Sequence, residues 1–190
     1  MSIEVTSLAI PDLKLVEPKR FEDERGFFSE TFNHEVLAAK GIDFQFVQDN
    51  HSLSRKQGTV RGLHFQRPPC AQAKLIRVVR GSILDVAVDL REQSPHYGRH
   101  VAMELSSKNW RQMFIPEGFA HGFCTLEPDT EVVYKVTTFY APQSDAGIFW
   151  NDPALAIAWP SFAGAEISPK DTALPAFADF RSPFTAMIGQ

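Results

Sequence analysis

Short runs rich in valine, isoleucine and threonine recur along this sequence, and glycine or proline stands between several of them. Such residues favour strands, and the 13 prolines and 11 glycines favour the turns that join strands. The runs lie at 44–54, 74–80, 82–90, 100–106, 110–115, 121–126 and 130–140. Strands at this short spacing exclude a helical bundle and a sheet with alternating helices, and they predict a sandwich or a barrel.

Two of the runs indicate which side chains share a face of a strand. In the first run, Gln48, Asn50 and Ser52 alternate onto the same face as two phenylalanines, because successive side chains of a strand point to opposite sides. The run 82–90 places leucines and valines on one face and two aspartates with an alanine on the other, which predicts a half-buried strand. The Arg80–Ser82 sequence before it is typical of a tight turn between strands.

Only one segment is typical of a helix. Asn33 is a suitable cap for the sequence HEVLAAK, and Gly41 follows where that helix would end. After Trp159 four prolines exclude long helices, so we expect this part to wrap the barrel as an ordered, irregular tail. We predict one all-β domain over residues 1–190, a jelly roll with one short helix, whose polar mouth would bind a ligand.

The composition argues against two classes of binding partner, nucleic acids and membranes. Lys and Arg number 19 against 23 Asp and Glu, so the net charge is −4, and neither nucleic acid nor a membrane is expected as a partner. No apolar stretch approaches the roughly 18 residues of a membrane helix, and the N-terminus lacks a basic segment followed by an apolar one, so we expect a cytoplasmic protein. Cys70 and Cys124 form no C-x-x-C motif, and we expect both to be buried or half-buried thiols.

Three clusters carry side chains suited to chemistry, although each taken alone favours a structural role. Arg61 and His64 flank a glycine in a strand-like sequence. A rigid turn that begins at Pro116 leads to His121 in the strand that follows. Tyr134 alternates onto the same face as two valines, which by itself indicates a core residue.

Two of these clusters together resemble the two half-motifs of the cupin superfamily, which implies a cupin jelly roll. In its metal-binding members the first half-motif holds His-x-His, but here the second position is Gln66. A neutral amide is a poor substitute for imidazole, and His64 with His121 falls short of the three or four protein ligands that transition-metal sites normally have. The sequence therefore predicts a cupin without a metal, whose histidines can transfer protons.

A closer resemblance covers nearly the whole chain. Its segments are Glu24-Arg25-Gly26-Phe27-Phe28, Gln48-Asp49-Asn50-His51-Ser52, Arg61-Gly62-Leu63-His64-Phe65-Gln66, Ala73-Lys74-Leu75, Ile115–Phe123, Tyr134-Lys135, Trp150-Asn151-Asp152-Pro153 and Ser168-Pro169-Lys170-Asp171. They resemble the dTDP-4-dehydrorhamnose 3,5-epimerase family and occur in its order. The resemblance implies conversion of dTDP-4-dehydro-6-deoxy-D-glucose to dTDP-4-dehydro-L-rhamnose, a step in the biosynthesis of dTDP-rhamnose for cell-surface polysaccharides.

Such a reaction needs a base, an acid on the other side of the sugar ring and a donor at the ketone oxygen, where charge collects as the enolate forms. His64 is the expected base, since imidazole titrates near neutrality. By resemblance, Asp171 pairs with His64 and Tyr134 is the acid. Lys74 is expected to stabilise the enolate oxygen, with His121 as a second donor. No cofactor is required.

The resemblance also assigns the binding of the nucleotide. Its pyrophosphate suits the forked hydrogen bonds of Arg25 and Arg61, with Lys170 as a point charge. The remaining family contact positions correspond to Phe27, Glu30, Gln48, Asn50 and Asp145, with Phe27 expected to stack on the base. The family further implies a homodimer in which the N-terminal strand region of one subunit crosses to the other and completes its pocket.

Three other functions stay open at this point. The first is a related epimerase that inverts only one carbon or acts on another activated sugar, and it would use the same catalytic residues. The second is a catalytically silent cupin that binds a sugar. The third is a metal-dependent cupin dioxygenase, which Gln66 disfavours.

Overall fold

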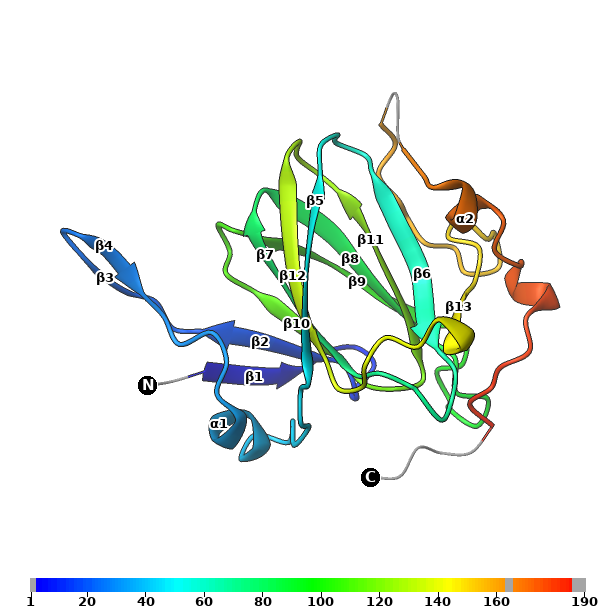
Figure 1. Ribbon diagram of the computed structural model, residues 1–190, viewed down its shortest axis with the longest axis horizontal. Helices are drawn as coiled ribbons and strands as arrows, with labels where there is room; N and C mark the ends of the chain where they lie inside the picture. Colours follow the sequence, from blue (N-terminus) through cyan, green and yellow to red (C-terminus); the bar gives the residue numbers. More distant parts are fainter. Residues whose placement is uncertain (1–2, 163–165, 186–190) are drawn as a thin grey trace.

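The computed structural model of the chain, which describes residues 3–162 and 166–185, contains two antiparallel sheets packed face to face (Figure 1). The six-stranded sheet has the order β1 (Ile3–Ser7), β2 (Lys14–Pro18), β10 (Gln112–Ile115), β7 (Lys74–Arg80), β12 (Thr130–Val136) and β5 (Gln48–Ser54). The five-stranded sheet has the order β13 (Asp145–Gly147), β6 (Val60–Gln66), β11 (Phe119–Thr125), β8 (Ser82–Asp89) and β9 (His100–Ser106). The predicted all-β jelly roll is confirmed.

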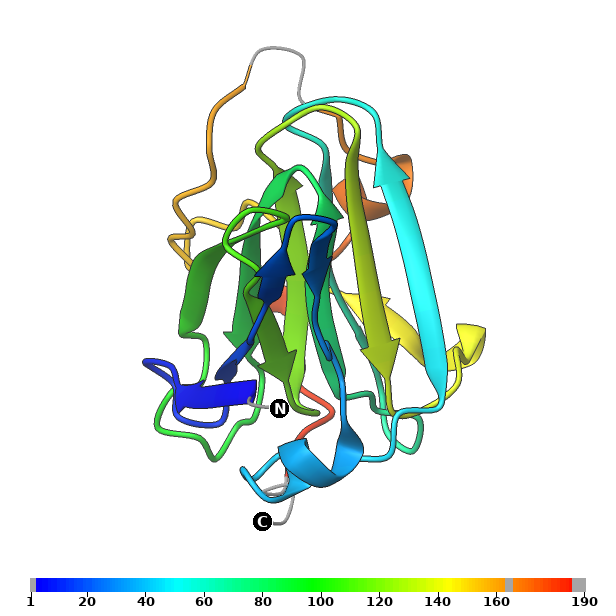
Figure 2. The ribbon, with the colours of Figure 1, turned by 90° about the vertical axis from the view of Figure 1, so that its left-hand side faces the viewer.

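A third, two-stranded sheet lies apart from the other two. Strands β3 (Phe21–Asp23) and β4 (Gly26–Phe28) form a hairpin that projects from the body of the molecule. In Figure 2, which is turned by 90°, this hairpin points toward the viewer. All its residues are exposed, including Phe27 at 55% and Phe28 at 63%. Large aromatic side chains in such an exposed position are typical of surfaces that contact another molecule.

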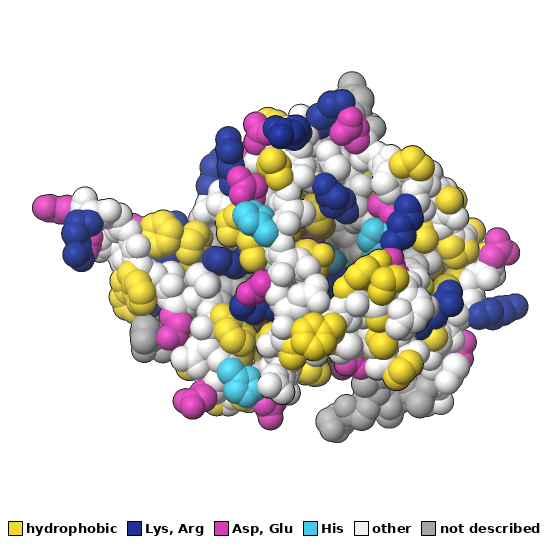
Figure 3. Space-filling view, in the orientation of Figure 1, with side chains coloured by type: hydrophobic (Ala, Val, Ile, Leu, Met, Phe, Trp, Pro, Cys, Tyr) yellow, Lys and Arg dark blue, Asp and Glu magenta, His cyan; other side chains and the backbone are white. Residues whose placement is uncertain are grey.

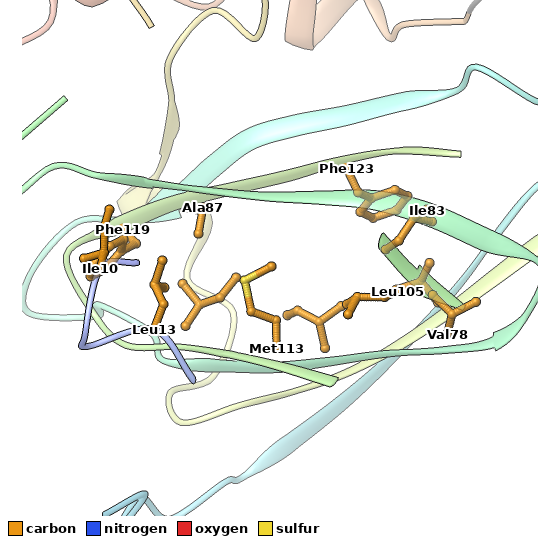
Figure 4. Packing of buried hydrophobic residues seen from close by; sticks show 12 residues of the cluster. Ile10, Leu13, Val78, Ile83, Ala87, Leu105, Met113, Phe119 and Phe123 are labelled. Carbon is orange, nitrogen blue, oxygen red and sulfur yellow. The ribbon is translucent and has the colours of Figure 1, made fainter. Parts of the chain in front are cut away.

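The sheets are held together by apolar side chains between them (Figure 4). Met113 on β10 and Val78 on β7 meet Ile83 on β8 and Phe123 on β11, all of them buried. Each such side chain contributes about 1.5–3 kcal/mol when it is removed from water. Strands β5 and β6, in contrast, direct polar side chains toward a cavity. The apolar core thus fixes the spacing of the two sheets, and the cavity lies beside this core between the same sheets.

Most predicted strands occur, but three of them end earlier or begin later than predicted. The run 44–54 begins its strand only at Gln48. The runs 74–80 and 100–106 are strands over those residues. The run 110–115 begins its strand only at Gln112, because Trp110 has a φ of 63° that breaks the extended backbone. The run 130–140 leaves the sheet after Val136, and its last residues make other contacts that are described below.

The prediction that 82–90 is half-buried was wrong, since both faces of β8 are covered. Asp85 and Asp89 are fully buried, and each has a basic partner. Arg91 pairs with Asp89, and His121 pairs with Asp85. An alternating pattern indicates which side chains share a face but not whether that face meets water, because paired aspartates can lie inside a protein.

Two short α-helices are present where one was predicted. The predicted helix is α1 (His34–Ala38), and the Asn33 side chain caps it by accepting a hydrogen bond from the Val36 N–H. The second is α2 (Pro169–Thr172), a single turn that the prolines permit because proline fits the first turn of a helix. Two 3-10 turns, η1 (Pro142–Ser144) and η2 (Phe177–Asp179), complete the list of helical segments in the described residues.

The C-terminal part wraps the five-stranded sheet, as predicted. Phe180 and Phe184 pack on Phe65 of β6, and Leu155 joins the same apolar cluster. This packing fixes the chain on both sides of α2 against the sheet. Among the described residues no helix is long and apolar enough to cross a membrane.

Candidate active site

A cavity of about 780 Å³ lies between the two sheets. Figure 3 shows histidine and basic side chains around a hollow on the face that carries β5 and β6. Ten of the thirteen site residues expected from the sequence line this cavity. They are Gln48, Asn50, Arg61, His64, Lys74, His121, Tyr134, Asp145, Lys170 and Asp171. They come from six strands and from α2, so only the fold brings them together.

His64 forms a short hydrogen bond with Asp171 across 107 positions of sequence. The distance from His64 Nε2 to Asp171 Oδ1 is 2.7 Å, and the other carboxylate oxygen accepts from the Gly62 N–H at 3.2 Å. Burial lowers the pKa of His64, an effect that the Asp171 carboxylate opposes and that Lys74 and Lys170 reinforce. The imidazole is therefore neutral at neutral pH and able to accept a proton.

The position of Asp171 depends on the short helix α2. The Ser168 hydroxyl caps this turn by accepting a hydrogen bond from the Asp171 N–H at 3.1 Å. Just before it, Ile167 forms a parallel bridge with Val60 of β6, and Glu166 pairs with Lys56 at 2.5 Å. These contacts attach the C-terminal part to β6 close to His64, and they leave Asp171 only 3% exposed.

A second histidine and carboxylate pair lies beside the first. His121 stands opposite His64 in the pairing of β11 with β6, and His121 Nε2 lies 2.7 Å from Asp85 Oδ1. The second carboxylate oxygen of Asp85 is buried without a hydrogen-bond partner in the described residues. Lys74 is 8% exposed, and burial lowers its pKa to about 8, against the attraction of Asp85 and Asp145.

Tyr134 lies on β12, in the sheet opposite to that of His64. Burial raises the pKa of its phenol, and the positive charge of Arg61 opposes the rise, so the phenol is protonated at neutral pH. Arg61 donates hydrogen bonds to the Ser54 hydroxyl at 3.1 Å and to the Leu53 carbonyl at 3.2 Å. Val60 and Arg61 both line the cavity, although consecutive residues of a strand normally face opposite sides. An irregularity in the pairing of β6 with β11 lies next to Arg61.

Polar groups also connect the residues at the mouth of the cavity. Asp145 pairs with Lys170, which raises the pKa of that lysine, and it accepts a hydrogen bond from the Tyr140 hydroxyl at 3.2 Å. On β5, the Gln48 side chain donates to the Asn50 side chain at 2.9 Å. The mouth therefore offers both a cation and amide groups to a polar ligand.

Three expected binding residues lie away from this cavity. Arg25 is in the projecting hairpin, where its side chain is 89% exposed and pairs with Asp23 at 2.5 Å. Phe27 packs edge-to-face on Trp110, with 4.9 Å between the ring centroids. Glu30 lines a separate cavity of about 210 Å³. Within one chain these side chains do not complete the site.

The side chains at the positions that bind metal in other cupins already form hydrogen bonds within this chain. His64 and His121 each bond to a carboxylate through Nε2, and the Gln66 carbonyl oxygen accepts from the Ala141 N–H at 2.7 Å. In the described residues no group of three or more His, Cys, Asp or Glu side chains is arranged to hold a metal ion.

Sequence reasoning assigned no role in this site to Asp85, Ser168 or Tyr140, and it did not predict the hydrogen bonds of Gln66. Asp85 lies in a run whose alternation is typical of a solvent-facing side, so no signal pointed to a role for it. Ser168 precedes Pro169 in the pattern of a helix N-terminus, which was a usable signal. Tyr140 and the hydrogen bonds of Gln66 gave no signal, because they depend on where the chain leaves a strand.

Comparison with known proteins identifies the family. The family model described as dTDP-4-dehydrorhamnose 3,5-epimerase matches residues 7–179. The dTDP-4-dehydrorhamnose 3,5-epimerase of Salmonella typhimurium is 51% identical over 172 residues, which cover 90% of this chain and 93% of the relative. The chain belongs to this family. The resemblance inferred from its motifs is therefore confirmed.

Solved structures agree with this assignment. The epimerase RmlC from Legionella pneumophila, in complex with dTDP-4-keto-L-rhamnose, is 42% identical and covers 97% of each chain with a TM-score of 0.92. ChmJ, a 3'-monoepimerase from Streptomyces bikiniensis in complex with dTDP-quinovose, is 33% identical and covers 91% of this chain and 87% of its own, with a TM-score of 0.85. The fold thus occurs both in a 3,5-epimerase and in a monoepimerase.

Proposed function

We propose that this protein inverts both carbons beside the ketone of a dTDP-linked 4-keto-6-deoxyhexose, and that it does so by acid-base chemistry between His64 and Tyr134. One observation carries the proposal: the His64–Asp171 pair and the Tyr134 phenol line one cavity from opposite sheets. A base and an acid so placed can act on opposite faces of a sugar ring between them, as an inversion requires.

The proposed sequence of proton transfers is redox neutral. His64 takes the proton from C3 or C5, and the bonding electrons move into the ketone to form an enolate. Nδ1 is the ring nitrogen left for this step, because Nε2 bonds to Asp171. Tyr134 then gives its proton to the same carbon from the other face, and the ketone re-forms. Solvent returns a proton to Tyr134 and takes one from His64.

Lys74 is proposed to stabilise the enolate oxygen, with His121 as a second donor. Its ammonium group is largely charged at neutral pH, since its pKa is about 8, and a buried cation acts strongly on a charge that develops beside it. Asp85 would hold the His121 ring in place, much as Asp171 holds His64.

The nucleotide end is proposed to lie at the mouth of the cavity, near Arg61 and Lys170. Arg25, Phe27 and Glu30 would complete the site from a second copy of the chain. This part of the proposal is supported by the projecting hairpin and its exposed aromatic side chains. A homodimer with exchanged N-terminal strands, a single domain over residues 1–190, action without a metal and a cytoplasmic location stay predictions.

One experiment tests the function. The protein is incubated with dTDP-4-keto-6-deoxyglucose in deuterated water, and the product is reduced by a ketoreductase with NADPH and analysed by NMR. We expect dTDP-rhamnose with deuterium at both C3 and C5. Deuterium at one carbon alone would identify a monoepimerase such as ChmJ, and no exchange would favour a silent sugar-binding cupin. Full activity after exhaustive chelation would support action without a metal.

A further inference from the structure

The segment Thr138–Ala141 leaves the six-stranded sheet but remains at the cavity. The sequence predicts a strand as far as residue 140, yet β12 ends at Val136. Phe139 is 67% exposed and Tyr140 is 56% exposed, so apolar packing does not explain the course of this segment. Its backbone groups must be satisfied in some other way.

Side-chain amides of three glutamines take the place of a neighbouring strand. Gln72 donates to the Thr138 carbonyl at 2.6 Å, and Gln48 accepts from the Tyr140 N–H at 3.1 Å. Gln66 bonds to the segment twice, because it donates to the Phe139 carbonyl at 3.3 Å and accepts from the Ala141 N–H at 2.7 Å. We call these three residues the amide clamp.

Gln66 is the central member of the amide clamp. It is 4% exposed, and it also donates to the Cys70 carbonyl at 2.7 Å, so both ends of its amide are engaged with backbone. It stands on β6 two residues after His64 and directly opposite Asp145 of β13. A buried amide with this many partners holds its neighbours in one arrangement, since losing it would leave buried backbone groups unpaired.

The clamped segment supports the polar groups at the cavity mouth. Tyr140 lines the cavity, and its hydroxyl donates to Asp145, which pairs with Lys170. Lys170 immediately precedes Asp171, the partner of His64. Contacts thus lead from Gln66, through the Phe139 and Ala141 backbone on either side of Tyr140, to the Tyr140 hydroxyl, Asp145 and the cation at the mouth. His64 and Tyr134 stand on β6 and β12, which are also held by their own strand partners.

We propose that Gln66 is a positioning residue that holds Tyr140, and through it Asp145 and Lys170, in the wall of the cavity where the nucleotide end of the substrate binds. This inference rests on the proposed function. The residue that occupies a metal-ligand position in related cupins here serves to shape the binding wall. Its loss weakens substrate binding more than it slows the proton transfers, because the wall moves while the reacting groups stay in place.

The test replaces Gln66 with Met, which has similar length but no amide. Full-length Gln66→Met protein is assayed with dTDP-4-keto-6-deoxyglucose, and its affinity for dTDP is measured by calorimetry. We expect KM and the Kd of dTDP to rise about tenfold, the effect of losing roughly one net hydrogen bond, with kcat changed less than threefold. Gln93→Met is the matched control, since Gln93 donates to the Thr185 carbonyl at 2.8 Å but does not line the cavity.

A double-mutant cycle with Tyr140→Phe separates positioning from a general loss of stability. If Gln66 acts through Tyr140, the effect of Tyr140→Phe on KM is largely lost in the Gln66→Met background. Unchanged KM in Gln66→Met, a loss confined to kcat, or fully additive effects would overturn the inference. If Gln66→Met does not fold, Gln72→Met tests the same segment by the same criteria. Absence of turnover in the wild type would instead reject the proposed function.

Discussion

His64 combines two environmental effects that pull its proton affinity in opposite directions. Burial disfavours the imidazolium, and the Asp171 carboxylate at 2.7 Å favours it. The result is a ring that is neutral before the reaction yet stabilised as a cation once it takes a proton. We expect His64→Ala to lower kcat by about 10²- to 10⁴-fold in protein that still folds, measured by steady-state kinetics and checked by calorimetry. Near-normal turnover would refute its assignment as the base.

Tyr134 gives a more selective test of the acid. Tyr134→Phe keeps the ring that packs on the core and removes only the hydroxyl. Removal of a substrate proton by His64 can then continue, but delivery to the opposite face cannot. We therefore expect deuterium exchange into the substrate to persist while the inverted product falls by about 10²-fold or more, as followed by NMR. Inversion at the full rate would place the acid elsewhere.

The pH dependence of kcat/KM follows from half-buried His64 and buried Lys74. The pKa of His64 is lowered, so the base remains neutral, and active, down to a pH below its ordinary value of 6.5. The pKa of Lys74 is about 8, so its cation is present below that pH and is lost as the pH rises through it. We expect activity to fall on the alkaline side near pH 8. Lys74→Met should be slow at every pH and should lack that alkaline fall.

The sequence identifies site residues that belong to recognisable motifs. It does not identify site residues whose role depends on their burial in the fold. His64, His121 and Tyr134 could be named because their motifs resemble a known family. Asp85 could not, because an aspartate in an alternating strand is typical of a solvent-facing side, and only the second sheet shows that this side is covered. The amide clamp was hidden for another reason, because its hydrogen bonds depend on where the chain leaves β12.

At the scale of secondary structure, β6 and β11 approach each other closely through two glycines. A Cβ added at Gly122 would lie 2.7 Å from the Arg61 carbonyl oxygen, and one added at Gly62 would lie 2.6 Å from the Gly122 Cα. This contact lies beside His64 and His121, so glycine there lets both rings share one cavity. No flexible side chain can move aside to admit a methyl group.

We therefore expect Gly122→Ala to destabilise the protein by about 1–3 kcal/mol, the usual cost of overpacking. Urea denaturation followed by fluorescence measures the effect. Thr6→Ala, at an exposed position of β1, is the control and should change stability by no more than about 0.5 kcal/mol. Equal stability of the two variants would show that the strands can separate at little cost.

The ends of strands were harder to predict than their existence. Alternation and β-branched residues predict the strands 74–80 and 100–106 with their correct ends, because a neighbouring strand pairs with each of them along its whole length. After Val136 the same residue types continue, but the partner strand β5 begins only at Gln48, which pairs with Val136. The backbone beyond that point has no strand beside it. The single turn of α2 is likewise too short for a periodic pattern.

At the scale of the whole molecule, the projecting hairpin is the feature that one chain does not explain. Its phenylalanines are exposed, and the Arg25 guanidinium pairs with Asp23 of the same hairpin. We expect a second copy of the chain to bury this surface and to bring a cation to the cavity that is proposed to bind the pyrophosphate. The family resemblance predicts that the N-terminal region crosses to the other subunit. The residue pattern alone does not show whether the hairpin serves the pocket of its own subunit or that of the partner.

A hybrid dimer tests this exchange directly. We expect the wild type to have about twice the 21.3 kDa chain mass by light scattering, and His64→Ala and Arg25→Ala each to be nearly inactive as homodimers. When the two variants are co-expressed with different tags and the hybrid is purified through both, one pocket combines an intact His64 with the partner's intact arm. That hybrid should regain about half the wild-type activity. If Arg25 served its own chain, each pocket of the hybrid would lack one essential group, and the hybrid would stay inactive.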